Sequence, residues 1–123
     1  MDDYGYLIIQ VFAANRGLPI EGAVVTLSDL EGKPIRILKT DRSGNTEKIT
    51  LAAPDRRNSE SPSNLQNYSS YNIKTQKDGY YPIEDKSVPI FGGQVTIQPV
   101  ALVPLPLGAY GKEEIIEDTE PNL

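Results

Sequence analysis

The sequence predicts an all-β protein, a seven-stranded antiparallel β-sandwich. Short runs with the two-residue alternation of a strand recur along the chain, and clusters of glycine, proline, asparagine and aspartate separate them at regular spacing. No segment has the 3.6-residue period of an amphipathic helix. A small closed barrel is the structural alternative. We expect strands at residues 5–14, 23–30, 35–40, 46–51, 71–77, 88–91 and 94–103.

The first expected strand is apolar on both of its faces. An antiparallel strand with one face in water usually alternates apolar and polar residues, so this pattern indicates a strand that is covered on both sides or serves an interface. One face carries Leu7, Ile9, Val11 and Ala13, and the other carries Tyr6, Ile8 and Phe12.

A corner with glycine and proline leads into the second strand. Pro19 favours an extended approach to it, and Ala23, Val25 and Leu27 then share one face, which we expect to be the core face. The small Ala23 directly follows Gly22, and small residues suit a place where two sheets approach closely. We therefore expect a close sheet contact at this corner.

Two turns bound the third expected strand. Gly32 suits the hairpin before it, and Thr40-Asp41-Arg42-Ser43-Gly44 follows it as a turn in which the aspartate can accept from the backbone ahead. The second segment is similar to a fragment of a calcium loop, but the dense carboxylate spacing of such a loop is absent. The pattern favours a plain β-turn, and we expect no metal site and no cofactor.

Residues 52–69 form a long segment without periodicity, and loops of this length in compact domains are usually functional or disordered.

Further along, residues 88–91 indicate a short edge strand, because Pro89 cannot donate a ladder hydrogen bond. Pro99 within the last strand predicts a bulge or a switch between sheets.

The acidic charge of the chain belongs to its C-terminal end. The net charge is -5, and residues 113–120 hold five of the 17 acidic side chains, so the rest of the chain is neutral. We expect a domain at residues 1–103 and a proline-containing, acidic, disordered tail at residues 104–123. The alternative for the tail is a docking peptide that uses Ile115 and Ile116. The balance of charge does not favour nucleic acid as a partner.

The chain contains no cysteine and no histidine, so it lacks a disulfide framework, the commonest general base and the commonest metal ligand. Acidic pairs such as Glu84-Asp85 lie in polar stretches, where carboxylates are normally solvated. We therefore expect no enzymatic activity.

The acidic start Met1-Asp2-Asp3 is unlike a secretion signal, and no apolar run is long enough to span a membrane. We expect synthesis in the cytoplasm without membrane insertion, and incorporation into a spore or cell envelope stays open.

The order of these motifs resembles the carboxypeptidase regulatory-like domains. The motifs are Pro19-Ile20-Glu21-Gly22-Ala23, then Thr40-Asp41-Arg42-Ser43-Gly44, then Gly79-Tyr80, and the likeness covers about residues 5–103. The resemblance implies a transthyretin-like (prealbumin-like) sandwich and a non-catalytic module. The entry to the fifth strand and the closing Leu102-Val103-Pro104 are similar to small Firmicutes proteins of cell-wall and spore-cortex systems.

A related family, the Cna B-type pilin and adhesin domains, joins its first and last strands by an isopeptide bond between lysine and asparagine or aspartate. This sequence departs from that pattern, because its first strand has no lysine and its last strand has no asparagine or aspartate. We therefore expect no crosslink.

These observations predict a non-catalytic interaction module that docks onto a protein or a cell-wall glycan assembly. The alternative is a structural subunit, such as a spore-coat or phage-type tip component, that forms homo-oligomers. Arginine and tyrosine often dominate binding energy, and long loops on rigid β scaffolds often carry recognition. The predicted contact patch is Arg56, Arg57, Tyr68 and Tyr81. The alternative interface is the first strand with its two apolar faces.

Overall fold

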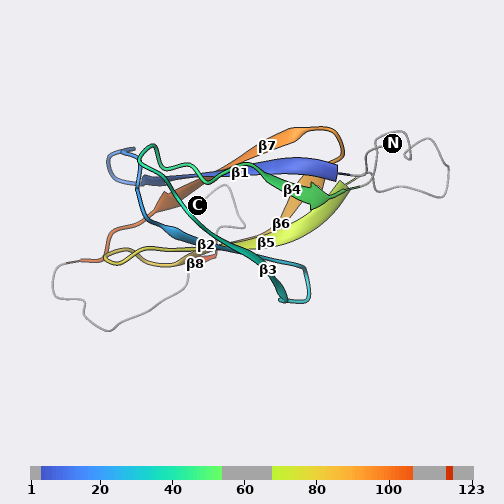
Figure 1. The fold of residues 1–123 in the computed structure, drawn as a ribbon. Helices are drawn as coiled ribbons and strands as arrows, with labels where there is room; N and C mark the ends of the chain where they lie inside the picture. The colour runs from blue at the N-terminus through green and yellow to red at the C-terminus, as the bar shows by residue number, and fades with distance from the viewer. Residues whose placement is uncertain (1–3, 54–67, 107–115, 118–123) are drawn as a thin grey trace.

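The structure, a computed structural model, describes residues 4–53, 68–106 and 116–117. Its strands are β1 (Tyr4–Ala13), β2 (Val24–Ser28), β3 (Pro34–Lys39), β4 (Ile49–Ala52), β5 (Tyr68–Gln76), β6 (Ile83–Phe91), β7 (Val95–Leu102) and β8 (Ile116–Glu117). A three-stranded sheet in the order β4-β1-β7 packs on a five-stranded sheet in the order β3-β2-β5-β6-β8 (Figure 1). The all-β sandwich is confirmed: β1 to β7 correspond to the seven expected strands, and β8 adds two residues.

The described residues include no helix of the length and apolarity that a membrane span needs.

The first and last long strands run parallel. β7 pairs with β1 without interruption, beginning at Tyr6 and Val95. The cause is the chain path: β6 belongs to the other sheet, and the turn after it returns the chain beside the start of β1, where Gly93 N–H donates to Tyr4 O at 2.8 Å. β7 therefore starts where β1 starts. The prediction of a wholly antiparallel sandwich is wrong for this pair, and for β6 with β8, which is also parallel.

Pro99 lies within β7 without disturbing it. The register with β1 continues through Gln10 and Pro99, so the predicted bulge or sheet switch is wrong. β7 is an edge of its sheet among the described residues, and an edge strand tolerates a proline because the missing N–H need not remove a ladder bond. The Pro99 carbonyl accepts a hydrogen bond from Gln98 Nε2 at 3.1 Å.

β6 is longer than the expected strand at residues 88–91, because a bulge divides its pattern. Ile83 and Asp85 are buried before the irregularity, whereas Val88 and Ile90 are buried after it, so the alternation changes phase. Ser87 at the irregularity has φ of 58°. A search for strict alternation therefore finds only the second half of the strand.

The core lies between the two sheets, as the alternation of the first two strands predicts. Val25 and Leu27 have no exposed surface, and Ile73 and Ile90 of the same sheet are buried beside them. The facing sheet contributes buried residues such as Leu7 and Ile9 of β1. The buried residues that confirm the predicted core faces are Leu7, Ile9, Val11, Ala13, Ala23, Val25 and Leu27.

Two glycines mark close backbone contacts, Gly5 at the start of β1 and Gly44 beside the corner that contains Pro19. A Cβ atom on Gly44 would collide with the carbonyl oxygen of Val11 and lie 3.1 Å from Pro19 Cβ. A Cβ atom on Gly5 would collide with the carbonyl oxygen of Phe91 and lie 2.7 Å from Ile90 Cγ2. A Cβ atom on Gly22 would meet only the end of the Lys77 side chain, at 3.2 Å. The backbones of β1 and β6 therefore approach closely where the chain enters β1.

The turn after β3 is supported by its own aspartate. Oδ1 of Asp41 accepts from the backbone N–H groups of Ser43 at 2.9 Å and Asn45 at 3.0 Å. Gly44 has φ of 81°, and its carbonyl accepts from Val11 N–H at 2.7 Å. The Asp41 carboxylate thus serves the backbone, as the β-turn interpretation predicts.

Two buried threonines tie this turn to both sheets. Thr40 Oγ1 accepts from Ala23 N–H at 2.9 Å and donates to Ile20 O at 2.6 Å. Thr46 Oγ1 accepts from Ile9 N–H at 3.0 Å. Thr46 N–H also donates to Ile9 O at 2.9 Å, and the regular strand begins later than predicted, at Ile49.

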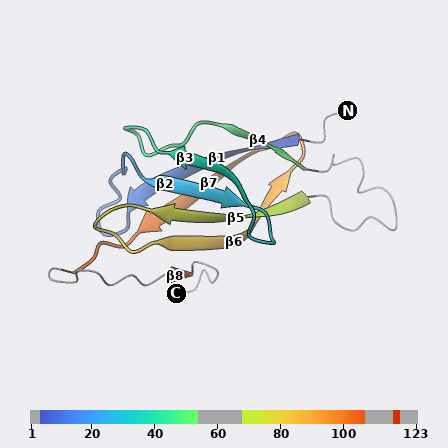
Figure 2. The same ribbon diagram turned by 60° about the horizontal axis from the view of Figure 1, so that its bottom comes forward.

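Of the predicted tail, the structure describes only residues 104–106 and 116–117. Leu105 N–H donates to Gly79 O at 2.9 Å, which holds the chain at the turn between β5 and β6. β8 then pairs with Ile83 and Glu84 at the edge of β6, as Figure 2 shows. Ile115 and the predicted disorder of the tail concern residues outside the described ranges.

Candidate interaction surface

The contact patch predicted from the sequence lies only partly within the described structure. Arg56 and Arg57 fall outside it. Tyr68 begins β5 and packs on Phe91, with 5.4 Å between the ring centroids. Tyr81 precedes β6 at the opposite end of the β5–β6 hairpin. The structure therefore does not bring Tyr68 and Tyr81 together, and the role of the loop residues stays a prediction.

The outward surface of the three-stranded sheet is apolar. Alternate residues of β1 are buried in the core, so the residues between them point away from it. β7 continues this surface, because Val95 lies opposite Tyr6 and Ile97 opposite Ile8. Val95 is 51% exposed and Ile97 is 58% exposed. We call this surface the β1–β7 face. Its apolar members are Tyr6, Ile8, Phe12, Val95, Ile97 and Pro99, and the exposed Gln10 lies among them opposite Pro99.

The β1–β7 face carries little charge. Lys48 lies beside it with Nζ 5.1 Å from the centroid of the Tyr6 ring, a cation–π contact. No acidic residue occupies the described outward positions of β1, β4 and β7. Contiguous exposed apolar surface on a soluble domain usually marks an interaction site. The two-faced pattern of the first strand predicts half of this face, whereas the β7 half depends on a long-range register that the sequence does not reveal.

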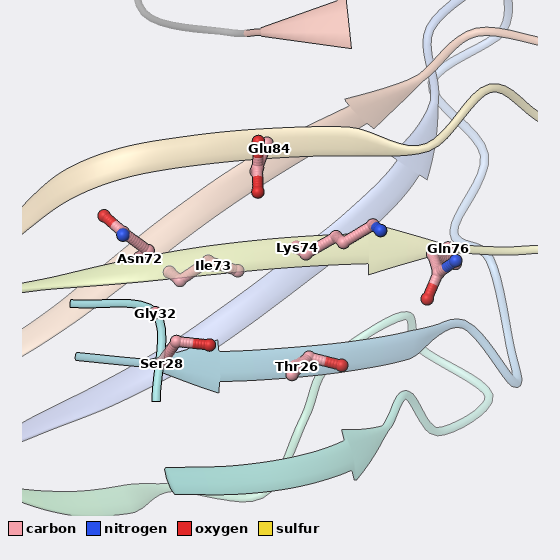
Figure 3. A pocket seen from close by; sticks show the side chains of 8 residues that line it. All are labelled: Thr26, Ser28, Gly32, Asn72, Ile73, Lys74, Gln76 and Glu84. Atoms are coloured by element: carbon pink, nitrogen blue, oxygen red, sulfur yellow. The ribbon is translucent and has the colours of Figure 1, made fainter. Parts of the chain in front are cut away.

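The outward surface of the five-stranded sheet differs, because its centre is polar and hollowed, although the exposed Ile37 of β3 lies at its side. A hollow of about 290 Å³ lies over β2, β5 and β6 (Figure 3). Its rim offers hydroxyl, carboxamide, ammonium and carboxylate groups. We call it the sheet groove, and it is lined by Thr26, Ser28, Gly32, Asn72, Ile73, Lys74, Gln76 and Glu84.

The acidic pair Glu84-Asp85 is not in a solvated loop, as the sequence suggests, but within β6. Glu84 faces the sheet groove, whereas Asp85 is 3% exposed on the inner side of the strand. Asp85 is the one carboxylate among the buried residues of the described ranges. The described residues include no group of three or more side chains that could hold a metal ion.

Tyr71 is a titratable group whose pKa departs clearly from its ordinary value. Its hydroxyl donates to Ala52 O at 2.6 Å, which joins β5 to the end of β4 across the sandwich. Burial raises the pKa of Tyr71 above the usual 10.0, because the core disfavours the phenolate. The folded state therefore holds this proton more tightly than the unfolded state does.

We expect alkaline destabilisation that depends on Tyr71. The stabilisation linked to the raised pKa is fully present below about pH 10 and is lost as the pH rises through the folded-state pKa. Tyr71→Phe should cost about 1 kcal/mol at pH 7 through the lost hydrogen bond, and should weaken the decline above pH 10. Urea unfolding between pH 7 and 11.5 measures both, and equal alkaline slopes for the two proteins would contradict the assignment.

Comparison with known proteins shows the fold and not a family. No family model matches the chain, and no curated protein matches its sequence. Among solved structures, the minor pilin GBS52 of Streptococcus agalactiae has a TM-score of 0.62 and 18% identity over 86% of this chain and 47% of its own. The Bacillus anthracis TIE protein has a TM-score of 0.57 and 14% identity over 84% of this chain and 17% of its own.

An enzyme also shares the fold: 3-chlorocatechol 1,2-dioxygenase from Rhodococcus opacus 1CP has a TM-score of 0.54 and 11% identity, over 85% of this chain and 62% of its own. This chain spans less than two thirds of the length of each of these three proteins. At such low identity the likeness establishes a common β-sandwich, and the chemistry must be argued from the residues of this chain.

Proposed function

We propose that this protein is a non-catalytic structural module that associates with copies of itself through the β1–β7 face. The exposed apolar surface formed by the register of β7 on β1 carries the proposal. The pilin among the structural neighbours supports an envelope assembly as its setting. The carboxypeptidase regulatory-like kinship and a cell-wall or sporulation role belong to the same proposal, and they rest on the sequence motifs.

The described parts of the chain's own tail lead away from the β1–β7 face. After β7, Pro104 forms a bridge with Tyr80, and Leu105 bonds to Gly79. β8 then pairs with β6. These contacts lie at the five-stranded sheet, so the described tail leaves the β1–β7 face open to a second molecule.

The dimensions of the face favour a reversible contact. Eight paired positions at about 3.3 Å each and two strands about 4.8 Å apart give a surface of roughly 250 Å². A standard specific interface buries about 800 Å² on each partner. Two such flat apolar sheet faces can pack about 10 Å apart, as the sheets of a sandwich do. We therefore expect self-association that strengthens with concentration.

A dilution series measured by sedimentation velocity tests the proposal. The apparent mass of the wild-type protein should rise between about 10 µM and 1 mM, the range of a weak interface. Ile97→Lys should remain monomeric at the highest concentration, because a lysine there would be desolvated by the partner. The matched control is Ile37→Lys, since Ile37 is 69% exposed on β3 of the other sheet and should not affect association.

Thermal unfolding of both variants shows whether they are folded. A wild-type protein that is monomeric throughout, or equal dissociation by the two lysine variants, would refute self-docking through this face. Association with a different protein that is lost in Ile97→Lys would favour the alternative, a docking module.

A further inference from the structure

The sheet groove lies on the side of the sandwich opposite the β1–β7 face, and the proposed self-association does not account for it. Its volume of about 290 Å³ is at the lower limit of small-ligand pockets, about 300–1,000 Å³. Because the two faces belong to different sheets, a molecule bound at the β1–β7 face would leave the groove accessible.

Two opposite charges face each other across the groove without forming an ion pair. Lys74 on β5 and Glu84 on β6 are direct cross-strand partners. Such neighbours on one sheet face commonly interact. Here the Lys74 side chain extends along β5 towards Gln76 rather than across to Glu84 (Figure 3). Arg36 and Glu47, by contrast, form an ion pair outside the groove, with 2.6 Å between Nη2 and Oε2. Both groove charges are therefore available to a ligand.

One wall of the groove is held in place by hydrogen bonds. Asn72 Oδ1 accepts from Ser87 N–H at 3.0 Å, and Asn72 Nδ2 donates to Asp29 O at 3.4 Å. Oδ1 of Asp29 in turn accepts from the N–H groups of Glu31 at 3.0 Å and Lys33 at 2.8 Å. The hairpin that contributes Gly32 is thus fixed before any ligand binds, which lowers the ordering cost of binding.

The backbone hydrogen-bonding groups of the two strands below the groove are already paired within the sheet. β2 pairs with β3 and β5, and β5 pairs with β2 and β6. An extended peptide that adds to a sheet needs free N–H and C=O groups at an edge, and this surface offers none in its two central strands. Recognition here must come from side chains.

We propose that the sheet groove binds a neutral glycan, one or two sugar rings at a time. Adjacent sugar hydroxyls both donate and accept, which matches the carboxylate of Glu84, the ammonium of Lys74 and the hydroxyl of Thr26. The single positive and single negative charge of the groove cancel, which favours a neutral ligand over a polyanion. Ile37 lies beside Thr26 in the neighbouring strand, so it offers apolar contact to the carbon face of a ring.

Amide chemical shifts of isotope-labelled full-length protein test this proposal, with neutral trisaccharides of glucose, N-acetylglucosamine and galactose as probes. At least one probe should shift signals on β2, β5 and β6 and leave those of β1 and β7 unchanged. Glu84→Gln and Lys74→Met should each weaken binding about tenfold, the effect of losing one charged hydrogen bond. Glu47→Gln and Lys48→Met are the matched controls, since they make the same replacements outside the groove, and they should bind like the wild type.

Several results would overturn the proposal: no shift with any of the three probes at 20 mM (about the limit for a useful weak site), unchanged binding in Glu84→Gln and Lys74→Met, or groove shifts with a zwitterionic tripeptide alone. The test is separable from that of self-association, because Ile97→Lys should still bind the sugar. A monomeric wild-type protein that binds the sugar would refute the proposed assembly and leave the groove intact.

Discussion

Val25→Asp should destabilise the domain severely, leaving it unfolded or close to unfolding at 25 °C. Val25 has no exposed surface and lies in the middle of β2, between Leu38 on β3 and Thr75 on β5. A carboxylate there would be buried without a cation or a hydrogen-bond donor to compensate its charge. This should lower the free energy of unfolding by about 4–5 kcal/mol or more. Single domains are typically stable by only about 5–15 kcal/mol, so this one change removes much of the margin.

The matched control is Val24→Asp, one residue earlier on the same strand. Val24 points to the opposite side and is partly exposed, so its replacement should cost less than about 1 kcal/mol. Circular dichroism and urea unfolding of the two variants measure the difference. Equal destabilisation would contradict the observed assignment of the two faces of β2.

Gly5→Val should have the second largest destabilising effect, because the larger side chain has no space in the fold. The new Cβ would collide with the carbonyl of Phe91, which belongs to the backbone of β6 and cannot rotate away, and would crowd Ile90 in the core. Overpacking of this kind typically costs about 1–3 kcal/mol, and a clash with backbone belongs to the upper part of that range.

Gln10→Val is the control for Gly5→Val, because it introduces the same side chain into β1 at an exposed outward position. Its melting temperature at low protein concentration should stay close to that of the wild type. Gly5→Val should melt several degrees lower, since about 1 kcal/mol shifts the midpoint by a few degrees in a domain of this size. Equal melting temperatures would show that β1 and β6 can move apart without cost.

Local sequence rules predict most of the fold. The alternation in the first two strands places Leu7 and Val25 in the core, and Asp41 marks its turn correctly. The rules fail where the phase of the alternation changes. The first half of β6 is not predicted, because the alternation of buried and exposed residues changes phase at Ser87. β7 carries Val95 and Ile97 on its outward side, although apolar residues in a strand normally mark the inner one.

The candidate surfaces are harder to predict than the fold, because they depend on which distant strands become neighbours. Tyr6 and Ile8 indicate an unusual first strand, but the sequence does not show that Val95 and Ile97 will lie beside them. Lys74 and Glu84 are likewise ordinary strand residues until the pairing of β5 and β6 sets them opposite each other. The segment with Arg56 and Arg57 is predicted as a recognition loop mainly because of its length.

Pro99 has a consequence for the size that any assembly can reach. Growth by adding strands at the margin of a sheet has no natural end, and it is the route by which β proteins form fibres. At this margin Pro99 cannot donate, and its carbonyl is already occupied by Gln98. Pro99 therefore weakens strand addition at this margin, because it removes one backbone donor from β7. A partner on the broad side of the sheet, by contrast, can form a symmetric contact that uses the same patch on both molecules and ends at a pair.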